Sequence, residues 1–478
     1  MIRFRHVFQA GWRSRLWSRI PLPIPSLGQV MACLSLLGLV SLGYLCGVCV
    51  MVFQLPSSDF MNKALTGAKA WNERGRRQAA RPSRPGGVGT EKVSVDEADK
   101  TFDGFTLYTT TEGARATLID MRGETVHQWE LPFRKAWPRA PHVDSPVSDE
   151  SIHWFRCHLY PNGDLLAVYV TDADTPYGYG LAKLNKDSQL LWAYPGRVHH
   201  DIHVAEDGTL YTLSQKVERT LPEGLESLPS PYISDSLVML SPDGRELANI
   251  PILDMFMNSP YALMFALNTD SLAPLSMAPQ LATPPPSGAP ASQVSLKELL
   301  AKGDFIHANS VRVLSRALAP KFSLFKPGQV LISLRNLDTL AVLDTRTRSV
   351  VWAAKGIWRI QHDADFLDNG HLLLYDNGGS VHGCRILEYD PVTQAIPWAY
   401  SNEDSMRFTP LYRGMKQRLP NGNTLIVDPD NARMFEVTLS KELVWESFCP
   451  RAVTALTSAR RYSPDELTFL KGKASARP

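Results

Sequence analysis

One recurring phrase constrains the fold of this chain more than any other feature. It consists of an apolar strand, a turn rich in Asp and other polar residues, and a second apolar strand that often ends in Trp. The six copies are LIDMRGETVHQW ending at Trp129, KLNKDSQLLW at Trp192, MLSPDGRELANI near residue 245, VLDTRTRSVVW at Trp352, EYDPVTQAIPW at Trp398 and EVTLSKELVW at Trp445. Self-similarity of this kind is the signature of a repeat architecture.

A second phrase interleaves with the first and predicts hairpins. An Asn-Gly or Asp-Gly turn precedes a short apolar strand in YPNGDLLAVYV (160–170), AEDGTLYTL (205–213), LDNGHLLLYD (367–376) and LPNGNTLIVD (419–428). These dipeptides favour type I′ turns, whose two central residues need positive φ. Each unit is therefore a small antiparallel sheet. Six such units predict an all-β fold, a six-bladed β-propeller over residues 102–450, whereas a β-sandwich would need neither the repeated Trp nor the count of six.

The segment before the repeats predicts a membrane anchor. Residues 1–29 form a short basic tail without acids, and residues 30–53 carry no charge, which is long enough for a transmembrane helix. A cleaved signal peptide is the alternative, but its apolar core is shorter, about 7–15 residues. The Arg-rich tail favours the cytoplasmic side. We therefore expect a single-pass protein of the inner (cytoplasmic) membrane, with a flexible stalk at 54–101 and the propeller in the periplasm or outside.

Other segments have less definite roles. Residues 252–303 insert a Pro-rich stretch between the third and fourth copies, and they are either a lid or a tolerated insertion. Residues 451–478 are expected to be a C-terminal tail, so closure of the ring should bring a strand near residue 105 beside one near residue 445. Lys plus Arg is 50 and Asp plus Glu is 48, which gives no electrostatic reason to expect a nucleic-acid partner.

Three cysteines lie outside the anchor: Cys157, Cys384 and Cys449. In an oxidising compartment two of them could form a disulfide. The spacing does not determine which two. Closure of the propeller makes Cys157 and Cys449 the neighbours to expect.

Two histidines occupy the same register in two repeats. His200 precedes the turn residue Gly208 by eight residues, and His362 precedes Gly370 by the same number; Asp follows each His. The equivalent positions in two other repeats hold Phe155 and Gly414, so the repeat itself does not require His. Because the strand before the turn should be the innermost of its blade, both histidines should face the centre of the propeller.

Three further residues belong with these two: His307 in HANSV, Arg335 in SLRN and Arg385. The alternative is that each His is a strand residue bonded to a backbone carbonyl. A set of His and Arg suits an oxyanion, since guanidinium offers a fixed fork for it and His can act as nucleophile, acid or base. No carboxylate-rich or Cys-rich set accompanies them, so we predict neither a metal nor a cofactor.

At these residues the chain resembles the bacterial arylsulfotransferases, the arylsulfate sulfotransferase family of six-bladed propellers. The segments that carry the resemblance are DGFTLYTTTEGARATLIDMRGETVHQW, HHDIHVAEDG, HANSV, SLRN, QHDADFLDNG and RLPNGNTLI. They are fairly specific as a set and span about residues 102–450. The anchor and stalk depart from the family, whose well-characterised members have a cleaved signal and an extra N-terminal β domain.

The resemblance implies an activity and roles for four residues. The family transfers a sulfuryl group from an aryl sulfate ester to a phenolic acceptor in a ping-pong cycle that uses no nucleotide sulfate donor. His362 aligns with the nucleophile, His200 and His307 with two supporting histidines, and Arg335 with the sulfate-binding Arg. Two other functions stay open. One is a non-catalytic propeller that binds protein or glycan. The other is a quinone-dependent dehydrogenase, which VLDTRTRSVVW resembles, although that copy lacks the usual Gly.

Overall fold

The computed structural model describes residues 93–226, 228–266, 302–380, 383–401, 404, 413–450, 453 and 455–471. These residues form six antiparallel sheets. From the inner to the outer strand, the first three are β25 (Leu456–Tyr462), β2 (Phe105–Thr110), β3 (Arg115–Ile119), β4 (Thr125–Glu130); β5 (Ile152–Leu159), β6 (Leu165–Thr171), β7 (Gly178–Leu184), β8 (Leu190–Tyr194); and β9 (Val198–Val204), β10 (Leu210–Glu218), β11 (Tyr232–Leu240), β12 (Glu246–Pro251). The other three are β13 (Ala308–Val313), β14 (Val330–Leu334), β15 (Thr339–Asp344), β16 (Ser349–Lys355); β17 (His362–Phe366), β18 (Leu372–Ser380), β19 (Gly383–Tyr389), β20 (Trp398–Ser401); and β21 (Met415–Arg418), β22 (Thr424–Asp428), β23 (Arg433–Val437), β24 (Leu443–Phe448), β1 (Val93–Asp96).

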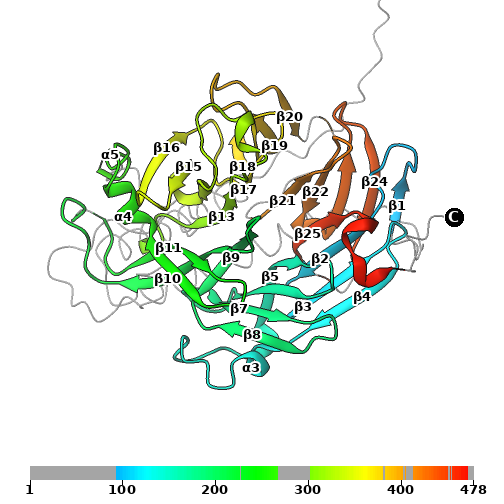
Figure 1. Cartoon of the computed structure of the whole chain (residues 1–478), viewed down its shortest axis with the longest axis horizontal. Coiled ribbons are helices and arrows are strands. Elements are labelled where there is room, and N and C mark those ends of the chain that lie inside the picture. Colours follow the sequence, from blue (N-terminus) through cyan, green and yellow to red (C-terminus); the bar gives the residue numbers. More distant parts are fainter. Residues whose placement is uncertain are drawn as a thin grey trace, which may run out of the picture. The chain divides into compact units, whose positions relative to one another are not determined.

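The six sheets are the blades of a propeller. The innermost strand of each sheet contacts the innermost strands of both neighbouring sheets, so these six strands form a closed ring. Figure 1 shows the blades following one another around this ring in chain order. The count of six predicted from the repeats is confirmed, and the β-sandwich alternative is excluded.

Two strands lie outside the range 102–450 that the repeats predicted for the propeller. β25 is the innermost strand of the first blade, with Phe105 opposite Tyr462, and β1 is an extra outer strand beside β24, with Asp96 opposite Trp445. The first blade therefore combines both ends of the repeat region, which closes the ring. The expected pairing of strands near residues 105 and 445 is wrong, because β25, which carries neither repeat phrase, takes the inner position of the first blade.

The repeated Trp residues join neighbouring blades. The indole Nε1 of Trp129 donates to the carbonyl of Gly163 in the second blade, and that of Trp445 donates to Met121 in the first. Trp398 donates in the same way to Leu439. Each donor lies on an outer strand, and each acceptor lies in a turn of the next blade. The Trp of the repeat is thus a contact between blades, which explains its recurrence.

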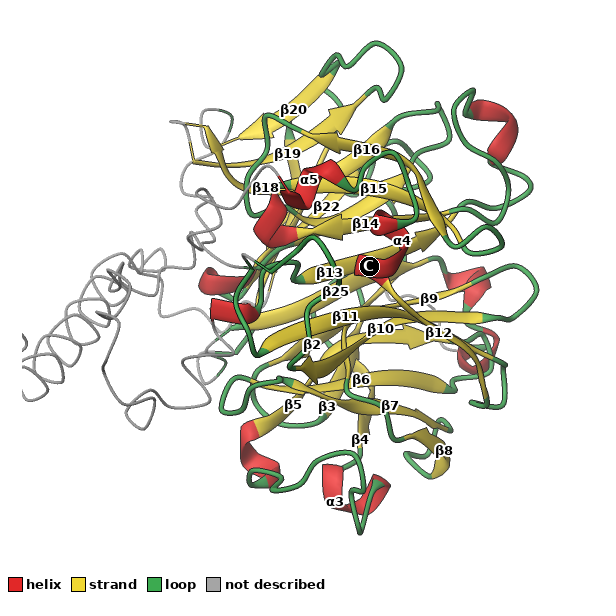
Figure 2. Ribbon diagram, turned by 90° about the vertical axis from the view of Figure 1, so that its left-hand side faces the viewer, coloured by secondary structure: helices red, strands yellow, loops and turns green. Residues whose placement is uncertain are grey.

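The helices with both ends in the described part of the chain are short, and Figure 2 shows them in the connections and at the ends of strands. They are α3 (Phe133–Ala136), α4 (Ile252–Met257), α5 (Leu263–Ala266) and six 3-10 turns at Asp149–Ser151, Ala319–Lys321, Arg335–Leu337, Pro429–Asn431, Pro464–Glu466 and Thr468–Leu470. Phe256 of α4 and Phe265 of α5 are fully buried in the core. The predicted insertion at 252–303 thus begins as a packed part of its blade, and residues 267–301 lie outside the described residues.

The predicted anchor at 30–53 also lies outside the described residues. Within the described ranges, no helix is both long enough and apolar enough to cross a membrane. Cys157, Cys384 and Cys449 are all buried, and none of the three is in a disulfide with another described residue. Each packs in a different hydrophobic cluster. The disulfide considered for Cys157 and Cys449 does not form, because closure of the ring places them in separate parts of the core.

Candidate active site

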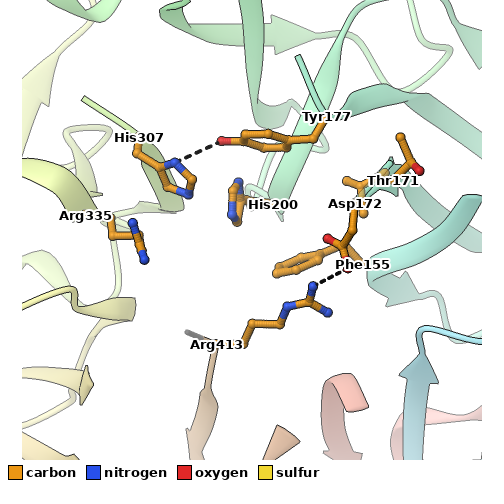
Figure 3. Close-up of a pocket in the computed structure, with 9 residues that line it drawn as sticks. Phe155, Thr171, Asp172, Tyr177, His200, His307, Arg335 and Arg413 are labelled. Atoms are coloured by element: carbon orange, nitrogen blue, oxygen red, sulfur yellow. Dashed lines mark hydrogen bonds and ion pairs between the residues drawn. The ribbon is translucent and has the colours of Figure 1, made fainter. Parts of the chain in front are cut away.

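Three of the four predicted site residues line one pocket. The pocket has a volume of about 190 Å³. Its lining residues come from strand ends in four blades (Figure 3): Phe155, Val170, Thr171, Asp172, Tyr177, His200, His307, Arg335 and Arg413. His307 comes just before the inner strand β13, and Arg335 just after β14, the antiparallel partner of β13. Both therefore lie at the same end of that blade.

β-Bulges place the pocket residues at this end. The pairing of the inner strand with its neighbour is interrupted at Trp154/Arg156, around His200 and Asp201, at Ala308/Ser310 and between His362 and Asp365. A bulge redirects side chains and is frequent beside active sites. His200 and His307 have φ of 55° and 51°, a left-handed conformation that is uncommon for residues other than Gly. The backbone is thus specially shaped where these histidines lie.

His362, the fourth predicted residue, lies beside the pocket and outside its lining. Its Nδ1 donates to the carbonyl of Ile360 at 2.9 Å and to Oδ1 of Asn377 at 2.7 Å. Nδ2 of Asn377 donates to the carbonyl of Arg413, which fixes the orientation of the amide. Because both partners of Nδ1 are acceptors, the ring carries its proton on Nδ1 and its lone pair on Nε2.

Burial keeps the imidazole of His362 neutral. The pKa of His362 is lowered to about 3, chiefly by burial and then by the positive charge of Arg335. His200 and His307 also act on each other and on His362, and burial lowers the pKa of His200 well below its usual value. The four predicted residues thus belong to one electrostatic unit. At neutral pH His362 presents an uncharged nitrogen with a free electron pair.

His307 is held by a carboxylate. Its Nδ1 lies 2.6 Å from Oδ2 of Asp304 and 3.5 Å from the hydroxyl of Tyr177. Burial would raise the pKa of Asp304, but His307 outweighs this effect and lowers it. An ionised carboxylate behind a His orients the ring and stabilises its protonated form. The carboxylate of Asp304 therefore orients the imidazole of His307.

Arg335 is anchored to the same turn as His307. Its backbone N–H donates to the carbonyl of His307 at 3.0 Å, and its Nη1 donates to Oδ1 of Asn336 at 2.6 Å. The side chain of Asn336 in turn donates to the carbonyl of Asp304. The SLRN turn and the His307 turn are thus joined through backbone and side-chain bonds, so the guanidinium has a fixed position relative to His307.

His200 is the third member of the set, and it contacts a second histidine that lies beside a carboxylate. Its Nδ1 is 2.8 Å from Nδ1 of His199, and Nε2 of His199 lies 3.3 Å from Oδ1 of Asp235. If His199 keeps its proton on the side of this carboxylate, it accepts at Nδ1 and His200 donates there. The lone pair of His200 is then on Nε2.

A layer of buried ion pairs lies next to the histidines in the chain. Asp201 follows His200, and Asp363 follows His362. Arg156 and Arg312 each bridge both carboxylates, with contacts of 2.9 and 2.5 Å for Arg156 and 2.6 and 3.0 Å for Arg312. Lys416 lies 3.6 Å from Asp363. We call Arg156, Asp201, Arg312, Asp363 and Lys416 the ion layer; each comes from a different inner strand.

Sequence reasoning missed Arg413, Tyr177 and Asp172. Arg413 precedes Gly414, the residue in register with His200 and His362, and this position is the one signal that could have found it. Phe155, the other register equivalent, does line the pocket. Arg385, by contrast, does not join the site: its Nη2 donates to the buried Asp376 at 2.6 Å and to the carbonyl of Ile357. In the described part of the chain, no group of three or more His, Cys, Asp or Glu could hold a metal ion.

Fold and site together define a six-bladed β-propeller with a His- and Arg-lined pocket where its inner strands begin. The sequence of residues 157–449, more than half of the chain, matches the family model described as "Arylsulfotransferase (ASST)". The chain therefore belongs to the arylsulfotransferase family, which confirms the resemblance seen in its sequence. Among proteins with curated descriptions, none matches.

Solved structures show more distant likeness. A protein of unknown function from Bacteroides caccae has a TM-score of 0.46 and 10% identity, covering 75% of this chain and 98% of that one. A virginiamycin B lyase from Staphylococcus aureus has a TM-score of 0.36 and 7% identity, covering 75% of this chain and 84% of that one. At these scores the likeness bears on neither substrate nor mechanism.

Proposed function

We propose that this protein moves a sulfuryl group from an aryl sulfate ester to a phenolic acceptor through a sulfohistidine on His362. The observation that carries the proposal is the state of this side chain. Two acceptors hold the proton on Nδ1, and burial keeps the ring uncharged, so Nε2 has a free electron pair at neutral pH. A nucleophilic His needs both properties.

The reaction divides into two balanced half-reactions. The Nε2 lone pair of His362 attacks sulfur, the sulfur–oxygen bond to the aryl group breaks, and the phenolate leaves with the bonding pair and takes a proton from His307. The acceptor phenol then gives its proton to His307, its oxygen attacks sulfur, and the nitrogen–sulfur bond breaks. Its electron pair returns to Nε2. The imidazole ring is positively charged while it carries the sulfuryl group, and the acceptors Ile360 O and Asn377 Oδ1 stabilise that charge.

The other groups have distinct parts in this scheme. Arg335 binds sulfuryl oxygens with a guanidinium fork in a position fixed by the His307 turn. His307, backed by Asp304, carries the proton. His200 contacts Phe155 edge to face and positions the aromatic ring of the substrate between the reacting groups. The pocket volume of about 190 Å³ suits one aromatic ring, since a cavity of about 150 Å³ holds benzene.

A direct assay tests the proposal. The purified propeller domain is incubated with p-nitrophenyl sulfate, with and without phenol, and release of nitrophenol is followed. Release that depends on phenol, with a protein adduct of one sulfuryl group after brief exposure to the donor alone, is the expected result. A flat trace at high protein concentration contradicts the proposal and favours a non-catalytic propeller, which many propellers are.

We also propose that residues 30–53 anchor the protein in the inner membrane with the propeller outside the cytoplasm. The uncharged run and the Arg-rich tail before it support this placement. The test is fractionation of cells that express the full chain, followed by protease treatment of spheroplasts. The propeller should sediment with membranes and be cleaved from outside; a soluble or protected propeller contradicts the proposal.

A further inference from the structure

We propose that Arg413 makes this pocket selective for aromatic substrates that carry a carboxylate on the ring. The inference rests on the proposed sulfuryl transfer and names the class of substrate for it. One sulfuryl group needs one guanidinium fork, and Arg335 supplies it. The pocket holds a second guanidinium, on Arg413, with no part in that chemistry. Figure 3 shows Arg335 near His307 on one side of the pocket, and Arg413 next to Phe155 and Asp172 on the other side.

The geometry around Arg413 fits a ring with an anionic substituent. The guanidinium carbon of Arg413 lies 6.0 Å from the centre of the Phe155 ring. Phe155 also contacts His200 edge to face, with the ring centres 4.9 Å apart. An arene that packs on Phe155 therefore has the reacting groups on one side and Arg413 on the other. A carboxylate opposite the reacting oxygen would reach the free edge of that guanidinium.

The present partner of Arg413 is replaceable. Its Nη2 donates to Oδ2 of Asp172 at 2.6 Å, and the side chain of Asp172 is 67% exposed while that of Arg413 is only 22% exposed. An ion pair with a well-solvated partner contributes little to stability. Asp172 can turn into solvent while a substrate carboxylate takes its place, so the guanidinium never loses an anionic partner.

The neighbour behind this pair adds no competing charge. His153 is buried on β5, and burial lowers its pKa to about 4, with Arg413 acting in the same direction and Asp172 against it. It is therefore neutral at neutral pH. Arg413 itself is held in place through its backbone, because its carbonyl accepts from Asn377, the residue that also accepts from His362. A side-chain substitution at Arg413 leaves that bond intact.

The test compares two acceptors that differ in charge. With saturating p-nitrophenyl sulfate as donor, kcat/KM is measured for 4-hydroxybenzoate and for its uncharged methyl ester. We define the ratio as kcat/KM for 4-hydroxybenzoate divided by kcat/KM for the methyl ester. Arg413→Gln should lower this ratio by about 10-fold, as expected for loss of one charge-assisted contact. Any general damage to catalysis, and the different acidities of the two phenols, cancel when this ratio is compared between variants.

Two further variants make the result specific. Arg115→Gln is the control. Arg115 is an exposed Arg of the first blade, paired with Glu130 of the same blade, and its substitution should leave the ratio unchanged. Asp172→Asn should raise the ratio several-fold, and this gain should vanish in the Asp172→Asn/Arg413→Gln double variant. An unchanged ratio in Arg413→Gln, or a gain that persists without Arg413, overturns the inference. Transfer to the methyl ester separates that failure from failure of the proposed function, which would abolish transfer to both acceptors.

Discussion

Two of the site histidines, His200 and His362, each precede an Asp of the ion layer, yet the His and the Asp have different charge states and partners. His200 and His362 are neutral because burial lowers their pKa values. Asp201 and Asp363, one residue further on, each form ion pairs with two Arg. Burial would raise the pKa of Asp363, but Lys416, Arg156 and Arg312 outweigh it and hold the pKa well below its usual value.

The two groups also differ in what they connect. Oδ2 of Asp201 accepts from the backbone N–H of Val311 at 2.9 Å, and Oδ2 of Asp363 accepts from that of Lys416 at 2.9 Å. Each Asp thus joins its own blade to the next one. The histidines, by contrast, have Nε2 available for substrate. Adjacent residues therefore have different roles. The Asp bonds its own blade to the next one, and the His offers a nitrogen lone pair to the substrate.

The largest expected effect comes from removing the side chain of His362, at the start of β17. His362→Ala should reduce sulfuryl transfer by roughly 10⁴-fold or more, because no other group in the pocket replaces a nucleophile. The sulfuryl adduct seen by mass spectrometry should disappear with it. The free energy of unfolding should fall by no more than about 2 kcal/mol, because one hydrogen-bonded side chain is lost. Retained activity, or an adduct on another residue, would show that the nucleophile is misassigned.

Substitution of Asp363, the residue after His362, should affect stability much more strongly than substitution of His362 does. Asp363→Ala leaves Arg156, Arg312 and Lys416 buried without one of their anions, and should lower the free energy of unfolding by about 3–5 kcal/mol. Urea denaturation measures this loss. The control is Asp187→Ala, which removes an exposed partner of Lys186 and should cost about 0–1 kcal/mol. Equal losses in the two variants would contradict the structural role of the ion layer.

The blade count was predictable from the sequence because the repeat is a local signal. Each turn dipeptide and each Trp reports a hairpin a few residues long, and Trp129 and Trp445 do contact the next blade. Closure of the ring was not predictable from the repeat. β25 carries neither phrase, and its pairing with β2 joins residues more than 340 positions apart, as in Thr109 opposite Ser458.

The site was predictable only where register carries information. His200 and His362 share a position relative to their turns, and His200, but not His362, lines the pocket. The ion layer stayed hidden because its pairs connect different blades, and because bulges at His200 and Asp363 break the simple alternation of inward and outward side chains. Arg413 was hidden because it precedes the register position by one residue. Arg385 was wrongly included because its closeness to His362 in the sequence does not reveal that its side chain pairs with Asp376.

The supporting histidines give the next smaller effect. His307→Ala and His200→Ala should each lower turnover by roughly 100-fold, the loss expected for a transition-state contact. Unlike Asp363→Ala, they should leave urea denaturation nearly unchanged. His371→Ala is the matched control, since His371 pairs with Glu388 at 2.8 Å next to the Gly370 turn, and it should retain full turnover. If His371→Ala is as impaired as the other two, the effect is not specific to the pocket.

The smallest expected effect is on the pH dependence of the free energy of unfolding, to which His362 and Asp363 contribute in different pH ranges. The folded pKa of His362, about 3, lies below the usual 6.5, so between these values the unfolded chain binds the proton first and stability falls as pH falls. The contribution is about 1.4 kcal/mol per pH unit. The pKa of Asp363 lies below its usual 3.8, so the stability it provides is lost only as pH falls below about 4.

His362→Gln should therefore reduce the slope of the free energy of unfolding between pH 6.5 and 5 by about 1.4 kcal/mol per pH unit, while Asp363→Asn should not change this slope. Urea denaturation at pH 5, 5.5, 6 and 6.5 measures both slopes, and a smaller slope in Asp363→Asn would mean that the acid sensitivity in this range belongs to the ion layer.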